Sequence, residues 1–77
     1  MKSDAVVFLD ALWLVARDKV EEFMVMAEHP DIRRIVLETD PAGLSPGWLP
    51  CVEKAQHLCR VVEARLAADA ALMEFAK

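Results

Sequence analysis

The most reactive side chains in this sequence are the thiols of Cys51 and Cys59, which lie eight positions apart in one predicted helix. At 3.6 residues per turn, that spacing separates them by about 12 Å along the axis and roughly 80° around it. A disulfide requires Cα atoms within about 7 Å, and a zinc site requires four ligands. We therefore expect free thiols that serve as small apolar core residues. The alternative is a metal ion or a disulfide shared across a dimer.

His57 follows Glu53 by one helical turn and precedes Cys59 by two residues. Side chains two positions apart point to opposite sides of a helix, so this spacing disfavours activation of a thiol nucleophile. Glu53 and His57 predict only a surface pair worth roughly 0.2–0.5 kcal/mol. His29, directly before Pro30, is expected to act as a cation at a helix C-terminus. The sequence thus predicts no catalytic residues, no cofactor and no metal site.

Asp18, Glu21 and Glu22 form an acidic cluster in which Asp18 and Glu22 are one helical turn apart. Metal sites in helical bundles use Glu-x-x-His motifs from facing helices, and this chain has none. We expect a solvent-exposed acidic face, with a charged partner-binding surface as the alternative.

Arg33 and Arg34 are the only adjacent basic pair, and they lie between two predicted helices. This order resembles a helix-turn-helix, whose tight form joins its helices by three or four residues. Here the connection is about ten residues long, and the next helix opens with Gly-Trp-Leu-Pro. The net charge of −4 leaves no basic stripe for phosphates or for an anionic membrane. Nucleic-acid binding is therefore an alternative, and both arginines are expected to point outward.

The element that must organise these side chains is residues 5–16, AVVFLDALWLVA, where only Asp10 is not apolar. We predict one continuous helix over residues 3–28, because the residue before Pro30 is pushed out of the α region. Residues 31–38 fit either a helix or a strand. With no second strand to pair with, a short helix is favoured. Residues 39–50 hold three of the four prolines and both glycines, which predicts a shaped connection before a second long helix at 49–76.

A heptad seam runs along the first predicted helix, and a second apolar row lies beside it. The seam consists of Val6, Leu9, Trp13, Ala16, Val20, Phe23 and Ala27, and the row of Ala5, Phe8, Leu12 and Val15. We expect the seam, with Trp13 on it, to be core. A second seam follows the last helix through Trp48, Val52, Ala55, Cys59, Val62, Leu66, Met73 and Ala76. Trp48 is expected to fold back onto the first helix, with a partner anchor as the alternative.

The composition indicates that the chain has more apolar surface than it can bury by itself. The chain has 77 residues and is 56% hydrophobic, above the usual content of about 45–50%. So small a chain has too little interior to hide that much apolar surface, and oligomerisation solves the problem. We predict an all-α fold in one domain, residues 1–77: two long helices and one short connecting helix form a helical hairpin or bundle, completed by dimerisation.

The predicted function follows from excess apolar surface, acidic charge and the missing catalytic set. We expect a homodimeric protein-interaction module that regulates, inhibits or adapts another protein, with nucleic-acid binding and a small enzyme or ligand carrier as alternatives. The start MKSD lacks the basic region of a signal peptide, and twelve apolar positions fall short of the roughly 20 needed to span a bilayer. We therefore expect a cytoplasmic protein. The predicted interface, as core or partner contact, comprises Val6, Leu9, Leu12, Trp13, Ala16, Val20, Phe23, Trp48, Val52, Cys59, Val62 and Leu66.

Overall fold

All regular secondary structure between residues 3 and 75, the part of the chain that the computed structural model describes, is helical. The α-helices are α1 (Asp4–Ala16), α2 (Val20–Met26), α3 (Pro30–Glu38) and α4 (Leu49–Phe75). Two short 3₁₀ turns, η1 (Pro41–Gly43) and η2 (Pro46–Trp48), form the connection before α4. The predicted all-α class and the predicted helical state of residues 31–38 are confirmed. Ala76, the predicted end of the last helix, lies outside the described residues.

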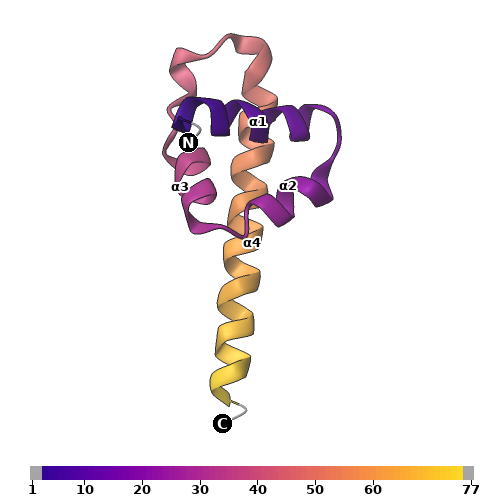
Figure 1. The fold of residues 1–77 in the computed structure, drawn as a ribbon, viewed down its shortest axis with the longest axis vertical. Coiled ribbons are helices and arrows are strands. Elements are labelled where there is room, and N and C mark those ends of the chain that lie inside the picture. The colour runs from indigo at the N-terminus through magenta and orange to yellow at the C-terminus, as the bar shows by residue number, and fades with distance from the viewer. Residues whose placement is uncertain (1–2, 76–77) are drawn as a thin grey trace.

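The helices pack around the N-terminal half of α4. In Figure 1, α1 crosses the upper part of α4, and α2 and α3 return below it. Contacts join α1 to all three other helices, and α2 and α3 also pack on α4. The Gln56 Nε2 group of α4 donates a hydrogen bond of 3.3 Å to the Val36 carbonyl of α3. Beyond these contacts α4 projects alone, so that every residue from 63 to 74 is exposed.

The prediction of one helix over residues 3–28 is wrong, because the chain breaks between Ala16 and Val20. The break is a Schellman motif, in which Lys19 N–H donates to the Leu14 carbonyl and Asp18 N–H to the Val15 carbonyl. Asp18 has φ of 60°, the left-handed conformation that this motif requires and that glycine usually supplies. Of the two long helices expected, the described chain therefore contains one, α4, with 27 residues.

The face of α1 that packs into the core is not the face of the predicted seam. The buried residues of α1 belong mainly to the second row: Phe8, Ala11, Leu12 and Val15. They meet Phe23, Ala27, Ile35, Val36, Val52, Ala55, Cys59 and Val62 from the rest of the chain. Trp13 is 53% exposed, so its prediction as core is wrong. Because the chain turns at Asp18, α1 and α2 no longer share one straight seam, and α1 is free to rotate its second row onto α4.

None of the helices within residues 3–75 combines the length and the apolar character needed to cross a lipid bilayer.

Candidate protein-interaction surface

Helix α1 has a second apolar face, opposite its buried one, made by Val6, Leu9 and Trp13. These three side chains are 43%, 52% and 53% exposed. Their spacing of three and four residues places them in a line along the helix. Single exposed apolar residues are ordinary, but a line of three large ones marks a surface that benefits from a partner. We call these three residues the outer face of α1.

Both ends of the outer face are held in a defined geometry. At the N-terminal end, the Ser3 Oγ atom caps the helix by accepting a hydrogen bond of 3.3 Å from the Val6 N–H. At the other end, the Arg17 guanidinium lies 4.4 Å from the centroid of the Trp13 ring, a cation–π contact. This contact favours one orientation of the indole by roughly 0.5–1 kcal/mol, which reduces the side-chain entropy that is lost when a partner binds.

A groove of about 500 Å³ opens beside the outer face, between α1, α3 and the connection that follows α3. We call it the α1–α3 groove. Its apolar walls come from Ala5, Phe8, Leu9, Ile35 and Leu44, and Gly43 lies at its edge without a side chain. Leu9 belongs both to the groove and to the outer face of α1. The two features therefore form one continuous apolar area.

Charged side chains line the groove from three separate elements. Asp4 belongs to α1, Arg34 and Glu38 to α3, and Asp40 to the following connection. Three carboxylates against one guanidinium give this lining a formal charge of −2. Arg34 Nη1 lies 3.6 Å from Glu38 Oε2, so the single cation is already paired within its own helix. The groove is thus apolar inside and acidic around its opening.

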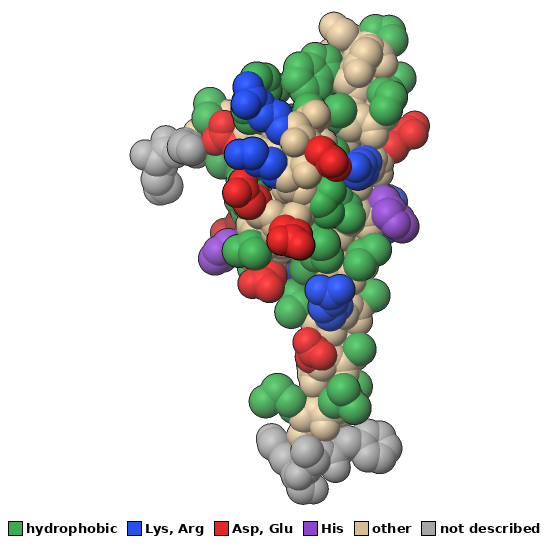
Figure 2. All heavy atoms as spheres, turned by 90° about the vertical axis from the view of Figure 1, so that its right-hand side faces the viewer, with side chains coloured by type: hydrophobic (Ala, Val, Ile, Leu, Met, Phe, Trp, Pro, Cys, Tyr) green, Lys and Arg blue, Asp and Glu red, His purple; other side chains and the backbone are tan. Residues whose placement is uncertain are grey.

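A second group of exposed apolar side chains lies away from α1. It consists of Val25 on α2 and of Leu66, Leu72 and Met73 on the projecting half of α4. Figure 2 shows hydrophobic side chains along this projecting part of the molecule. A smaller cavity of about 220 Å³ lies between α2 and α4, next to Val25 and Leu66. Glu21, Glu28 and Arg65 also line this cavity and give its lining a formal charge of −1. The α1–α3 groove differs from it in having more than twice the volume and a lining charge of −2.

The twelve residues predicted as interface separate into three classes. Five are buried core residues: Leu12, Phe23, Val52, Cys59 and Val62. Val20 and Trp48 are half-buried, and Trp48 packs against the core cluster. Its contact with the first helix stays a prediction. The exposed ones are Val6, Leu9, Trp13, Ala16 and Leu66. The structure thus brings together, on one face, three residues that the sequence placed in a buried seam.

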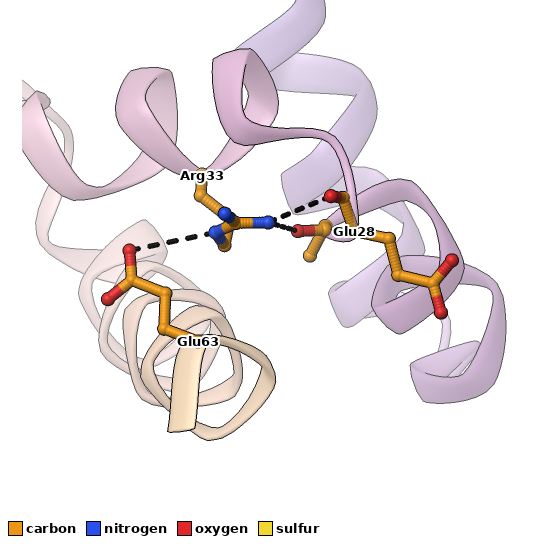
Figure 3. Close-up of polar contacts among 4 residues, drawn as sticks. Glu28, Arg33 and Glu63 are labelled. Atoms are coloured by element: carbon orange, nitrogen blue, oxygen red, sulfur yellow. Dashed lines mark hydrogen bonds and ion pairs between the residues drawn. The ribbon is translucent and has the colours of Figure 1, made fainter. Parts of the chain in front are cut away.

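Arg33 does not point outward, which corrects the expectation for the basic pair. Its Nη1 atom donates to the carbonyl oxygens of Ala27 at 2.8 Å and of Glu28 at 2.9 Å (Figure 3). Its Nε atom lies 3.6 Å from Glu63 Oε1 on α4, and the side chain is only 15% exposed. The Arg33 side chain is therefore mostly buried, and its guanidinium is bonded within the protein. Only Arg34 of the pair remains exposed, which weakens the basis of the nucleic-acid alternative.

The thiols and their neighbours lie in different environments. Cys59 is buried, and burial raises the pKa of its thiol from 9.0 to about 11, against the opposing effect of the Arg33 guanidinium. Cys51 is partly buried, and both cysteines are free. His57 and Glu53 are exposed, as expected for a solvent-facing surface. Within residues 3–75, no three His, Cys, Asp or Glu side chains are grouped to hold a metal ion.

The acidic cluster is divided by the break between α1 and α2. Asp18 lies in the turn, where its Oδ1 atom is 3.8 Å from Lys54 Nζ, whereas Glu22 lies on α2 and is 4.0 Å from Lys19 Nζ. Asp18 and Glu22 therefore do not lie one turn apart on the same helix. The prediction made from their spacing is wrong. All three acidic side chains are exposed.

Sequence reasoning missed the α1–α3 groove entirely. Its walls come from segments about 30 residues apart, and nothing in the local pattern of Phe8, Ile35 or Leu44 indicates that they meet. The only available signal was the second apolar row of α1, which showed that the helix has more than one apolar side.

Comparisons with protein-family models, with curated proteins and with solved structures found no match for this chain.

Proposed function

We propose that this chain is a protein-interaction module that self-associates as a homodimer through the outer face of α1 and regulates or adapts another protein. The observation that supports this most directly is that α1 has two apolar faces. The inner face builds the core, and the outer face leaves Val6, Leu9 and Trp13 about half exposed.

A second copy of the chain suits this surface for geometric reasons. In a two-fold symmetric dimer the same patch serves both subunits, so one apolar face covers its copy and each contact occurs twice. The patch lies on a straight helix, and two such helices can pack side by side along their apolar lines. Trp13 is the kind of residue that dominates the binding energy of interfaces, and its ring lies against the Arg17 guanidinium.

The test is the oligomeric state of a matched pair of variants. Trp13→Glu introduces a charge into the outer face, and Val25→Glu introduces the same charge at an apolar residue on α2 that is 65% exposed. We expect wild type and Val25→Glu to approach twice the chain mass of 8.6 kDa as concentration rises in sedimentation equilibrium. Trp13→Glu should remain monomeric, with an unchanged helical circular dichroism spectrum. A wild-type monomer at all concentrations, or equal behaviour of the two variants, would contradict self-association through α1.

A further inference from the structure

The α1–α3 groove has the size and lining of a binding site. Its volume of about 500 Å³ falls within the range of roughly 300–1,000 Å³ that is typical of ligand pockets. Phe8 and Ile35 form its buried part, being only 5% and 8% exposed, and Leu9 and Leu44 complete the walls. An apolar side chain that enters the groove therefore contacts apolar side chains on two of its walls, those of α1 and α3.

The charges around the groove determine the sign of a ligand. Asp4 and Asp40 contribute two carboxylates beside the Arg34–Glu38 ion pair, which is neutral as a whole, so the lining carries a net formal charge of −2. The Oδ1 atom of Asp40 accepts a hydrogen bond of 2.9 Å from the Ala42 N–H, which fixes that carboxylate at the edge of the groove. Anions are repelled from such an opening, whereas lysine and arginine side chains are attracted to it.

The three carboxylates are spread over three elements instead of meeting at one point. Asp4 is at the start of α1, Glu38 at the end of α3, and Asp40 in the connection beyond. A single small ammonium ion matches one of these positions. A peptide with several basic residues matches all of them, because basic side chains one helical turn apart border the same apolar stripe.

Building on the interaction module proposed above, we propose that the α1–α3 groove binds a cationic amphipathic segment of a partner protein. The segment places an apolar side chain in the groove against Phe8, Leu9 and Leu44, and lysine or arginine side chains against the acidic opening. This assigns the partner a chemistry: an apolar residue flanked by basic ones, in a helical segment.

Gly43 allows the groove to be filled without disturbing the fold. A Cβ atom added at Gly43 meets no other atom within 4 Å, and the residue does not have a positive φ. Gly43→Leu therefore places a side chain at the edge of the groove without a steric clash at Cβ. Gly47, in η2, has the same freedom but does not line the groove. Gly47→Leu is thus the matched control for the substitution itself.

The probe is a fluorescein-labelled peptide of about 14 residues, long enough to form a helix, with leucine and lysine at helical spacing. A second peptide replaces every lysine with glutamate, and a third replaces every leucine with serine. We expect fluorescence anisotropy to show binding of the leucine–lysine peptide alone. Gly43→Leu should weaken that binding about tenfold or more, and Gly47→Leu should leave it unchanged. Glu38→Gln combined with Asp40→Asn should weaken it and reduce its salt dependence.

Three results would overturn the assignment of the groove: unchanged binding by Gly43→Leu, equal loss in both leucine variants, or equal binding of the leucine–glutamate peptide. Circular dichroism of each variant establishes that it is folded. The oligomeric state of the same samples keeps the two proposals apart. Because Leu9 belongs to both surfaces, the peptide is also titrated into the monomeric Trp13→Glu variant. A folded Trp13→Glu monomer that binds no leucine–lysine peptide refutes the groove site alone. A wild-type monomer that binds the peptide, and loses that binding in Gly43→Leu, refutes self-association alone.

Discussion

The Arg33 side chain on α3 donates a hydrogen bond of 2.8 Å to the carbonyl oxygen of Ala27, at the C-terminal end of α2. The last carbonyls of a helix have no partner within the helix, so this bond satisfies a group that the break between α2 and α3 would otherwise leave open. The same Nη1 atom serves the Glu28 carbonyl, and the contact of Nε with Glu63 at 3.6 Å reaches α4. One side chain thus connects three helices.

Replacing Arg33 should therefore destabilise the protein much more than replacing Arg34. Arg33→Met removes the charged donor of two carbonyl oxygens and leaves Glu63 without its cation, and it should cost about 1.5–3 kcal/mol. Arg34→Met removes an exposed pair within α3 and should cost no more than about 0.5 kcal/mol. Urea denaturation of both variants measures the difference. Equal midpoints would show that Arg33 does not hold the α2–α3 corner.

The left-handed backbone at Asp18 predicts that glycine and alanine at this position change the stability of the protein in opposite directions. Asp18→Gly should keep or raise the free energy of unfolding by up to about 1 kcal/mol, because glycine adopts φ of 60° without a steric penalty. Asp18→Ala should lower the free energy of unfolding by about 1 kcal/mol, because the Cβ atom of alanine is crowded in the left-handed conformation. The ion pair with Lys54 matters little, since the Asp18 side chain is 90% exposed. Thermal unfolding of both variants tests this, and a more stable alanine variant would refute the strain at Asp18.

Neighbouring residues on α1 should respond very differently to truncation. Leu12 is fully buried, and Leu12→Ala should cost about 2–5 kcal/mol through the cavity it creates. Trp13 is 53% exposed, and Trp13→Ala should cost the isolated subunit less than about 1 kcal/mol. The comparison is made by urea denaturation at a dilution where the chain is monomeric. A large loss for Trp13→Ala under those conditions would place the indole in the core after all.

The buried thiol of Cys59 predicts a loss of stability at alkaline pH. Burial raises its pKa from 9.0 to about 11, so the unfolded chain releases this proton at a lower pH than the folded chain does. The contribution is complete below pH 9 and is lost progressively as the pH rises toward 11. Wild type should therefore lose more stability over this range than Cys59→Ala, for which this proton is absent. Parallel pH profiles of the two proteins would contradict an ionisation suppressed by burial.

The helical class, α3 and the start of α4 follow from local signals: proline and glycine positions, helix periodicity and the lack of a pairing strand. The break at Asp18 does not, because aspartate marks a left-handed turn far less clearly than glycine. Which row of α1 is buried could not be read from the sequence either. Val6, Leu9 and Trp13 are as apolar as Phe8, Leu12 and Val15, and only the crossing of α1 over α4 decides between them.

Arg33 shows a related limit of sequence reasoning. Its position beside Arg34 suggested two equivalent outward cations, yet a long side chain reaches back to the carbonyls of the preceding helix once the chain turns at Pro30. That turn depends on how α2 and α3 pack on α4. The α1–α3 groove depends on the same packing, so it too became visible only in three dimensions.

The most direct test of the central claim is a half-filtered nuclear Overhauser experiment on an equal mixture of isotope-labelled and unlabelled chains, which detects only contacts between copies. If the outer face of α1 is the self-association surface, the indole protons of Trp13 should show intermolecular effects to the methyl groups of Val6 or Leu9. Intermolecular effects that involve only Leu66, Leu72 and Met73 of α4, or none at all at millimolar concentration, would contradict it.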